Sequence, residues 1–435
     1  MSLYQPDKTI CLVKLEADSW CGTPPSTWEL TKLKYLFKER KDDSLGVFPP
    51  GAISFGEVIE KDMHNADTLG SYQDVHVGDF LVNPINLNYD LKSLRVAHSG
   101  INVRVSPAYI VLQSTSNNDA RYLRWLMYQF DVAHMKTLGA GVRQTITYSD
   151  MGPCQVYLPP LHEQERIANF LDEQTTRIDA LIAEKERLAS SLQDIEEVTA
   201  FDLVTRGLVA AASVTSFSEP WLKEVPAHWG LSKLRHLAFI GNGSTPKRDN
   251  EAYWEDGNIP WLNSGAVNAT RIVDASDYVT EVALKECHLP MVRPGSTVVA
   301  LTGQGKTRGT ASLTEIESTI NQHLAYVSLF DGRMSDEYLW VALTGLYSVL
   351  RHVSDGEGST KGALTCEQLN QLRLPVPPVG EQDAIVGAYV ERTQAIEALR
   401  AHVGEHVSRL REYRSSLISA AVTGQLDISA YKASA

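Results

Sequence analysis

The strongest constraint on the fold of this chain is an internal repeat with a constant spacing. The segment that begins PPLHEQERI at Pro159 returns as PPVGEQDAI at Pro377, 218 residues later. The offset holds without a gap as far as LVTRGL in the first copy and AVTGQL in the second. Each copy follows a region of very different sequence. A duplicated constant part behind two divergent parts predicts one scaffold that carries two different functional domains.

Each copy of the repeat is predicted to form a long helix. Mostly apolar residues recur in alternating steps of 3 and 4, which is the heptad pattern of a helix that packs along one seam. Neither copy contains proline after its opening diproline, and proline breaks a helix interior. The apolar seam positions are Ile167, Leu171, Ile178, Leu181, Leu188 and Leu192 in the first copy and Ile385, Tyr389, Ile396, Leu399 and Leu410 in the second.

A single exposed seam of this length would not be stable alone. A helix from Glu163 to about Thr205 would be on the order of 60 Å long. We therefore expect the two helices to pair within the chain as an antiparallel coiled coil. The alternative is that each helix packs only on its own neighbouring domain. Polar seam residues, such as Gln174 and Arg392, can fix the register of a helix pair.

A second repeated element leads into each divergent region. PSTWELTKLKYL begins at Pro25 and PAHWGLSKLRHL at Pro226, 201 residues later, so the second region is longer by 17 residues. We expect Trp28 and Trp229 to anchor the core of each domain. Strand-like runs rich in Val and Ile, broken by Gly, Pro and Asn, indicate that both domains are α+β.

These elements predict an α+β chain with a pseudo-twofold repeat, in which two long antiparallel helices join two globular domains. The expected parts are an N-terminal extension (1–22), a first domain (23–158), a first helix segment (159–212), a second domain (213–376), a second helix segment (377–428) and a short tail (429–435).

Composition removes several classes of protein. No run of about 18 apolar residues exists, so a transmembrane helix is not expected, and the N-terminus lacks the pattern of a secretory signal. The five cysteines are scattered without a CxxC pair, which fits reduced thiols in a cytoplasmic protein. The net charge is −13, of which residues 161–200 contribute −6. Because screening limits each field to roughly 10 Å, this acidity neither suggests nor excludes a DNA partner.

With these motifs the chain resembles the DNA-specificity subunit of type I restriction–modification systems. The resemblance rests on the duplicated Pro-Pro-x-x-Glu-Gln-x-x-Ile turn at Pro159 and Pro377, on the long helix after each turn, and on the Trp-x-x-x-Lys-Leu entry at Trp28 and Trp229. It covers nearly the whole chain, apart from residues 1 to about 22.

The resemblance implies a non-catalytic, DNA-binding chain. Each domain would be a target recognition domain that reads one half of a gapped double-stranded DNA site. The helices would hold the domains apart and would dock two methyltransferase subunits, which methylate adenine with S-adenosylmethionine. Restriction subunits, which are translocase–nucleases, would add a reaction that uses ATP and Mg. No cofactor, metal or catalytic residue is expected in this chain.

The residues that we expect to contact DNA lie in loops, most of them rich in glycine. Glycine lets the backbone approach a groove, and Arg, Lys and Gln side chains can bond to phosphates or base edges. The candidates are Lys92, Arg95, Arg143 and Gln144 in the first domain and Lys247, Arg248, Gln304, Lys306, Arg308 and Lys361 in the second. Each of them could instead be a solvated surface charge.

Two other functions remain open. The run ALTGQGKT, which ends at Thr307, resembles the end of a phosphate-binding loop, which would make the chain a P-loop enzyme centred on Lys306. Against this interpretation, the residues after Thr307 are a poor helix start, so no helix N-terminus would face the phosphate. The other alternative is a coiled-coil scaffold with no DNA role.

Overall fold

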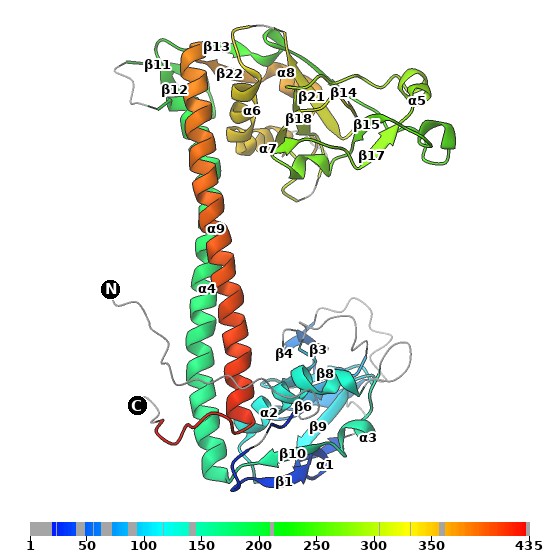
Figure 1. Cartoon of the computed structure of the whole chain (residues 1–435), viewed down its shortest axis with the longest axis vertical. Helices are drawn as coiled ribbons and strands as arrows, with labels where there is room; N and C mark the ends of the chain where they lie inside the picture. The colour runs from blue at the N-terminus through cyan, green and yellow to red at the C-terminus, as the bar shows by residue number, and fades with distance from the viewer. Residues whose placement is uncertain are drawn as a thin grey trace. The chain divides into compact units, whose positions relative to one another are not determined.

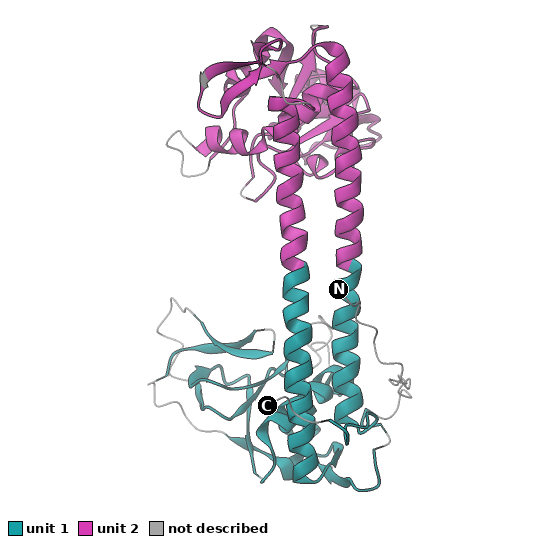
Figure 2. Ribbon diagram, turned by 90° about the vertical axis from the view of Figure 1, so that its left-hand side faces the viewer, with its two compact units in different colours: residues 1–185, 405–435 teal, residues 186–404 magenta. Residues whose placement is uncertain are grey.

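The computed structural model describes residues 20–22, 24–40, 48–54, 56–61, 72–85, 94–115, 117–138, 145–208, 213–303, 305–330, 332–355 and 362–431. The chain divides into two compact units (Figure 2): unit 1 comprises residues 1–185 and 405–435, and unit 2 comprises residues 186–404. The predicted fold class is confirmed, because each unit combines a mixed α/β domain with a part of both long helices (Figure 1).

The two repeats form the long helices α4 (Leu161–Arg206) and α9 (Val379–Val422), of 46 and 44 residues. Each helix starts directly after its diproline, as the sequence predicts. A glycine with positive φ follows each helix: Gly207 (77°) comes directly after α4, and Gly424 (70°) comes two residues after the end of α9. A left-handed glycine is a common helix stop because it lacks the Cβ that disfavours this conformation.

Within each unit the helices run antiparallel. In unit 1, Ile167 near the start of α4 shares a hydrophobic core with Leu417 near the end of α9. In unit 2, Leu203 near the end of α4 shares a core with Ile385 near the start of α9. The start of one helix therefore lies beside the end of the other in both units.

In unit 1 the central sheet has four antiparallel strands in the order β2-β9-β6-β7, and a separate antiparallel pair joins β1 to β10. The elements of the domain are β1 (Glu29–Lys32), α1 (Leu33–Leu36), β2 (Phe37–Arg40), β3 (Gly51–Ser54), β4 (Glu57–Glu60), β5 (Gln73–Val75), β6 (Phe80–Val82), β7 (Val96–His98), β8 (Val103–Val105), β9 (Ile110–Ser114), α2 (Ala120–Ala133), η2 (Met135–Thr137), α3 (Tyr148–Met151) and β10 (Gln155–Leu158).

In unit 2 the central sheet has the order β14-β21-β18-β19-β16, and β13 pairs with β22. The elements are β11 (Val214–Glu219), β12 (Leu222–Pro226), β13 (Gly230–Lys233), η3 (Leu234–His236), β14 (Ala238–Asn242), η4 (Glu251–Tyr253), β15 (Ile259–Leu262), η5 (Ala266–Asn268), β16 (Arg271–Ile272), β17 (Asp277–Val279), α5 (Glu281–Glu286), β18 (Thr297–Ala300), β19 (Ala311–Thr314), β20 (Thr319–Ile320), β21 (Leu324–Leu329), α6 (Asp336–Gly345), α7 (Tyr347–Asp355), α8 (Cys366–Gln371) and β22 (Arg373–Val376).

The two domains share the same arrangement of strands. The four strands of the first sheet correspond in order and direction to β14, β21, β18 and β19 of the second. In each unit the strand after the tryptophan pairs with the strand that leads into the diproline. The main cores include the predicted anchors Trp28 and Trp229, which are both buried. The prediction of two tryptophan anchors is therefore confirmed.

The apolar seam positions of the helices differ in burial. Ile167, Leu171, Ile178, Leu192, Ile385 and Tyr389 are buried; Ile396 and Leu410 are partly buried; and Leu181, Leu188 and Leu399 are 46%, 40% and 45% exposed. Five of the six buried positions also belong to the hydrophobic core of a domain. The seam is thus most deeply buried where a domain packs against the helix pair.

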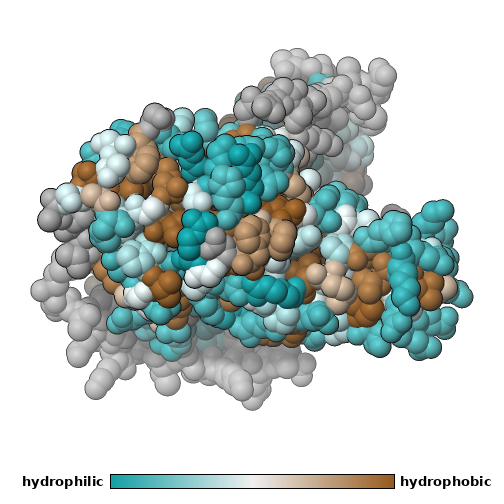
Figure 3. Space-filling model, turned by 90° about the horizontal axis from the view of Figure 1, so that it is seen from above, coloured by the Kyte–Doolittle hydropathy of each residue, from teal (hydrophilic) through white to brown (hydrophobic). Residues whose placement is uncertain are grey.

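The surface is mixed in character. On the face drawn in Figure 3, hydrophobic residues come to the surface in separate patches among hydrophilic ones. Among the described residues, no helix combines the length and the apolar composition needed to cross a membrane.

Candidate nucleic-acid interface

The repeated Glu-Gln pair fixes each domain to a long helix. In unit 1 the Trp28 indole N–H donates to Glu163 Oε2 at 2.9 Å. The Gln164 side chain, only 1% exposed, accepts from the Asp119 backbone N–H at 3.0 Å and donates to the Pro159 carbonyl at 2.9 Å. Because Asp119 is the N-cap of α2, Gln164 ties a helix of the domain to the start of α4.

The same contacts recur in unit 2. The Trp229 indole N–H donates to Glu381 Oε2 at 2.9 Å. This bond, with a smaller contribution from His228, lowers the pKa of the Glu381 carboxyl, so the group stays ionised. Gln382 accepts from the backbone N–H of Ser335, the N-cap of α6, at 2.8 Å. We call the two tryptophans and the two Glu-Gln pairs the clamp residues.

The end of the central sheet in unit 2 carries a chain of polar side chains. β14 and β18 end here, and the antiparallel β21 begins here. Thr245 donates to Gln322 Oε1 at 2.6 Å, Gln322 Nε2 lies 3.2 Å from His323 Nε2, and His323 Nδ1 lies 3.0 Å from Thr302 Oγ1. The network therefore connects three loops, two of which contain residues that the sequence predicts to contact DNA.

Arg248 is held beside this network by two aromatic rings and a carboxylate. Its guanidinium lies over Trp254, 3.9 Å from the ring centroid, and 5.1 Å from the centroid of Trp261. Arg248 Nη1 donates to Asp277 Oδ1 at 3.0 Å, and the side chain is still 56% exposed. The neighbouring Lys247 is also exposed. Both residues are thus placed where an external ligand could reach them.

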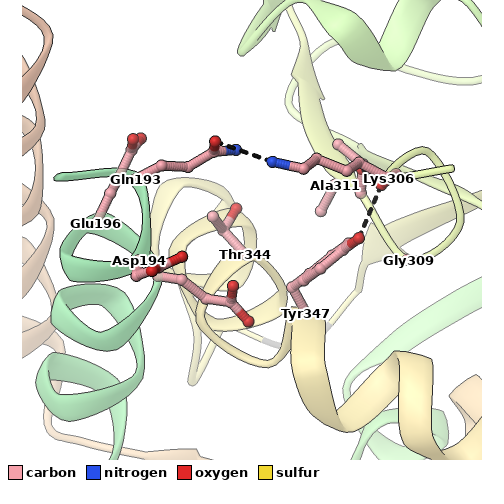
Figure 4. A pocket seen from close by; sticks show the side chains of 10 residues that line it. Gln193, Asp194, Glu196, Lys306, Gly309, Ala311, Thr344 and Tyr347 are labelled. Atoms are coloured by element: carbon pink, nitrogen blue, oxygen red, sulfur yellow. Dashed lines mark hydrogen bonds between the residues drawn. The ribbon is translucent and has the colours of Figure 1, made fainter. Parts of the chain in front are cut away.

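Lys306 points to the helix α4 (Figure 4). Its Nζ donates to Gln193 Oε1 at 2.9 Å, and its backbone carbonyl accepts from the Tyr347 hydroxyl at 3.0 Å. A cavity of about 370 Å³ lies here within unit 2, and the α4 side of its wall includes Asp194 and Glu196. Lys306 therefore connects the loop between β18 and β19 to the helix that carries the domain.

The phosphate-binding-loop alternative does not fit this geometry. β18 leads through the described part of the loop to the antiparallel strand β19, with no helix between them. A phosphate-binding loop needs a helix N-terminus that faces the phosphate. The lysine that would contact the phosphate is bonded to Gln193 instead.

Arg308 occupies a buried position. It is 5% exposed and donates to Asp355 Oδ1 at 2.5 Å, at the end of α7. The guanidinium thus joins the base of the loop to the helical part of the domain.

In unit 1 the described candidate is Arg95, which is partly buried beside β7. Its Nη1 donates to the Ile85 carbonyl at 3.1 Å, and its backbone N–H donates to Asp131 Oδ2 at 2.5 Å. The other candidates, Lys92, Arg143, Gln144, Gln304 and Lys361, lie outside the described residues.

The sequence of the chain matches the model of a known protein family. The family model for the type I restriction modification DNA specificity domain matches residues 85–189 and 226–390, which is more than half of the chain. The chain belongs to this family. The first matched segment covers the later part of the first domain, the second starts at the entry to the second domain, and each continues into the long helix that follows.

Members of the specificity-domain family resemble the chain at low identity. The chain is 27% identical over 175 residues to the type I restriction enzyme MjaIX specificity subunit of Methanocaldococcus jannaschii, a match that covers 39% of each protein. It is 20% identical over 434 residues to the putative MjaX specificity subunit of the same organism, covering 94% of this chain and 95% of the relative.

A solved structure shares the fold. It comes from work titled "Structural basis underlying complex assembly and conformational transition of the type I R-M system", and it covers 93% of this chain and all of its own. The TM-score is 0.67 at 17% sequence identity. At this identity the likeness shows a shared fold.

Sequence reasoning on this specificity-domain chain missed the partners of the candidate residues. Gln322 and His323 form the run Asn-Gln-His just before a strand, and such an exposed polar run at a strand end is a signal that could have found them. Trp254 and Asp277 follow Arg248 by 6 and 29 residues, and nothing in the sequence spacing links them to it.

Proposed function

We propose that this chain is the sequence-recognition subunit of a type I restriction–modification complex. Each domain reads one half of a gapped double-stranded DNA site, and the helix pair sets the distance between the two readers. The observation that supports this most strongly is that the two domains share the same strand order and the same clamp contacts, while the residues in their loops differ. Two readers on one scaffold suit two different half-sites, which are commonly separated by about one helical turn of DNA, ~34 Å.

The shared parts suit shared partners. Both helix segments and both sets of clamp residues repeat, so one kind of protein can dock at both copies. We propose that this protein is an adenine methyltransferase subunit, present twice in the complex. S-adenosylmethionine then belongs to the methyltransferase, and ATP with Mg belongs to restriction subunits. The chain itself contributes recognition and no catalytic group.

The test is methylation by the assembled complex. We would express the full chain with its cognate methyltransferase subunit in a host without adenine methylation and map the modified adenines in genomic DNA. A two-part motif with a fixed gap is the expected result. Methylation without sequence preference, or none in a complex that assembles, would favour a scaffold that has no DNA role.

Exchange of one domain tests the modular design. Replacing residues 23–150 with the equivalent part of a relative should change one half of the motif and leave the other half intact. Removing about two helical turns from both α4 and α9 should instead alter the gap. A domain exchange that changes both halves would contradict separate readers.

A further inference from the structure

Arg248, one of the described candidate residues of unit 2, is an exposed cation that is held by both an aromatic ring and a carboxylate. Trp254, whose ring lies under the guanidinium, donates its indole N–H to the Lys247 carbonyl at 3.0 Å. Trp254 also packs edge-on against Trp261, with 5.2 Å between ring centroids. Trp261 is 2% exposed and belongs to a small core with Val279. The aromatic surface below Arg248 is therefore fixed to the fold.

The carboxylate beside Arg248 is fixed as well. Asp277 opens β17, where it is the cross-strand partner of Trp261. Its Oδ1 accepts from Arg248, and its Oδ2 accepts from Asn263 Nδ2 and Ser276 Oγ, each at 3.3 Å. The hydrogen bond from Arg248 is the main reason that the pKa of Asp277 is lowered, so the carboxylate stays charged at neutral pH.

A ring below and a carboxylate at one side fix both the plane and the rotation of the guanidinium. Among the described residues, Arg248 donates only to Asp277, although a guanidinium has five N–H donors in a rigid fork. The remaining donors can serve a ligand without a change of rotamer. A planar fork that is already oriented matches two acceptors on the edge of a guanine, O6 and N7.

The local charge favours a base over a phosphate. Asp277 partly neutralises Arg248, and the loop after it carries exposed acidic side chains, at Asp249, Glu251 and Glu255. A phosphate placed here would meet several carboxylates, whereas a guanine edge is uncharged. Lys247, on the same loop, is an exposed cation without such a carboxylate partner among the described residues; it provides the matched comparison.

We propose that Arg248 is a specificity-determining residue that reads one guanine of the half-site recognised by unit 2, with Trp254 and Asp277 as its positioning residues. This inference rests on the proposed function, because it assigns a base class to one of the two readers. It predicts that the loss of Arg248 relaxes one base pair of one half-site, while the other half-site and the gap stay unchanged.

The experiment uses the full chain assembled with its cognate methyltransferase subunits. The complex would methylate a plasmid library in which each position of the motif is randomised. For Arg248→Ala, discrimination at one G·C pair should fall by roughly 5- to 150-fold, the range of one good bidentate contact. Arg248→Lys should not restore it, because an ammonium lacks the planar fork. Asp277→Asn and Trp254→Leu should relax the same position to a smaller extent.

Lys247→Ala is the control on the same loop. A point-charge contact to phosphate carries no base information, so this variant should weaken methylation of all sites equally or leave it unchanged. Arg248→Met keeps an unbranched chain over Trp254 and decides the outcome if Arg248→Ala does not fold. An unchanged motif in the folded Arg248 variants, or a uniform loss across all sites, would overturn the inference. A wild-type complex without sequence preference would instead contradict the proposed function itself.

Discussion

The contacts that fix a domain to its helix are alike in the two units, whereas the loops at the ends of the central strands are not. Glu163 and Gln164 make the same kinds of bonds as Glu381 and Gln382, with donor–acceptor distances that agree within a few tenths of an ångström. At the end of β18, by contrast, Thr302 joins a network of polar side chains. The corresponding strand β6 is followed by Asn83, whose side chain accepts a local backbone bond from Ile85.

The fold constrains the clamp residues more strongly than the loop residues. The clamp glutamines are buried and bond to backbone groups, so a replacement leaves a donor or an acceptor without a partner. The loop side chains are exposed and can exchange their partners for water. Sequence can therefore diverge in the loops at little cost in stability, which a pair of readers for different half-sites requires.

The largest effect is expected from loss of a clamp glutamine. Gln382→Ala removes three hydrogen bonds, to Ser335 N–H, to the Arg333 carbonyl and to the Pro377 carbonyl, at a site with no exposure. Each buried group left unpaired costs about 1–3 kcal/mol, so the free energy of unfolding should fall by about 3 kcal/mol or more in urea titration. The exposed Gln394→Ala on the same helix should change it by less than ~0.5 kcal/mol.

Gln164→Ala tests whether the clamp residues of the two units contribute equally to stability. A loss of stability similar to that of Gln382→Ala is expected, because Gln164 bonds to the Asp119 N–H, the Pro159 carbonyl and Asn118 Oδ1. A loss of unfolding free energy below ~1 kcal/mol would mean that only the clamp glutamine of unit 2 contributes to stability.

The free energy of unfolding should depend on pH through Asp131, a residue of unit 1. Asp131 is buried, and burial raises the pKa of its carboxyl to about 6, despite bonds from the Arg95 and Val96 backbone N–H groups. Folding therefore favours the protonated form of this group more than the unfolded chain does. The stability from this group is fully present below its unfolded pKa, near 4, and declines as the pH rises to about 6.

The size of this effect is at most about 3 kcal/mol. Asp131→Asn keeps an oxygen acceptor for the two N–H groups and cannot ionise. The difference in unfolding free energy between wild type and variant should shift in favour of the variant between pH 4 and 6, measured by urea titration at each pH. A difference that stays constant across this range would show that Asp131 does not change its ionisation there.

Removal of the tryptophan hydrogen bonds should lower the free energy of unfolding by a smaller amount, and by a similar amount in both units. Trp229→Phe and Trp28→Phe keep an aromatic ring but remove the indole N–H that bonds to Glu381 or Glu163. A hydrogen bond to a charged acceptor contributes about 1.5–3 kcal/mol. The exposure of the Glu381 carboxyl places the expected loss near the lower end of this range, about 1.5 kcal/mol, in thermal or urea unfolding. Unequal losses would show that the two anchors are not equivalent.

The smallest effect concerns the helix pair in unit 1. Arg414 donates to both oxygens of Asp179, at 2.8 and 3.1 Å, but the carboxylate is half exposed. Exposed ion pairs contribute about 0–1 kcal/mol. A double-mutant cycle with Arg414→Met and Asp179→Asn should therefore give a coupling energy below ~1 kcal/mol, reduced further by salt.

The sequence predicted what depends on local periodicity. The heptad pattern and the diprolines gave the long helices, and the repeated Trp28 and Trp229 gave the anchors. Burial along the seam was not predictable in the same way, because Leu181 and Leu188 have the same pattern as Leu171 but lack a domain beside them. Periodicity reports the face of a helix and not what covers that face.

The candidate site was only partly predictable for a related reason. Lys306 and Arg308 are separated by one residue, yet the first bonds to Gln193 and the second is buried against Asp355. Such partners lie 113 and 47 residues away in sequence. A loop composition therefore indicates the type of chemistry, while tertiary contacts decide which side chains face a ligand.

The strand pairs beside the clamps have a practical consequence for engineering. Leu30 lies opposite Tyr157, and Leu231 lies opposite Pro375. The chain thus enters and leaves each domain at neighbouring points. In this respect each domain resembles a large insertion into a loop, whose two ends also lie close together. Grafts cut at these strands would need no new linker, because any domain with similarly close ends could continue directly into the diproline and its helix. The two strand pairs are natural splice sites for building recognition subunits with new combinations of domains.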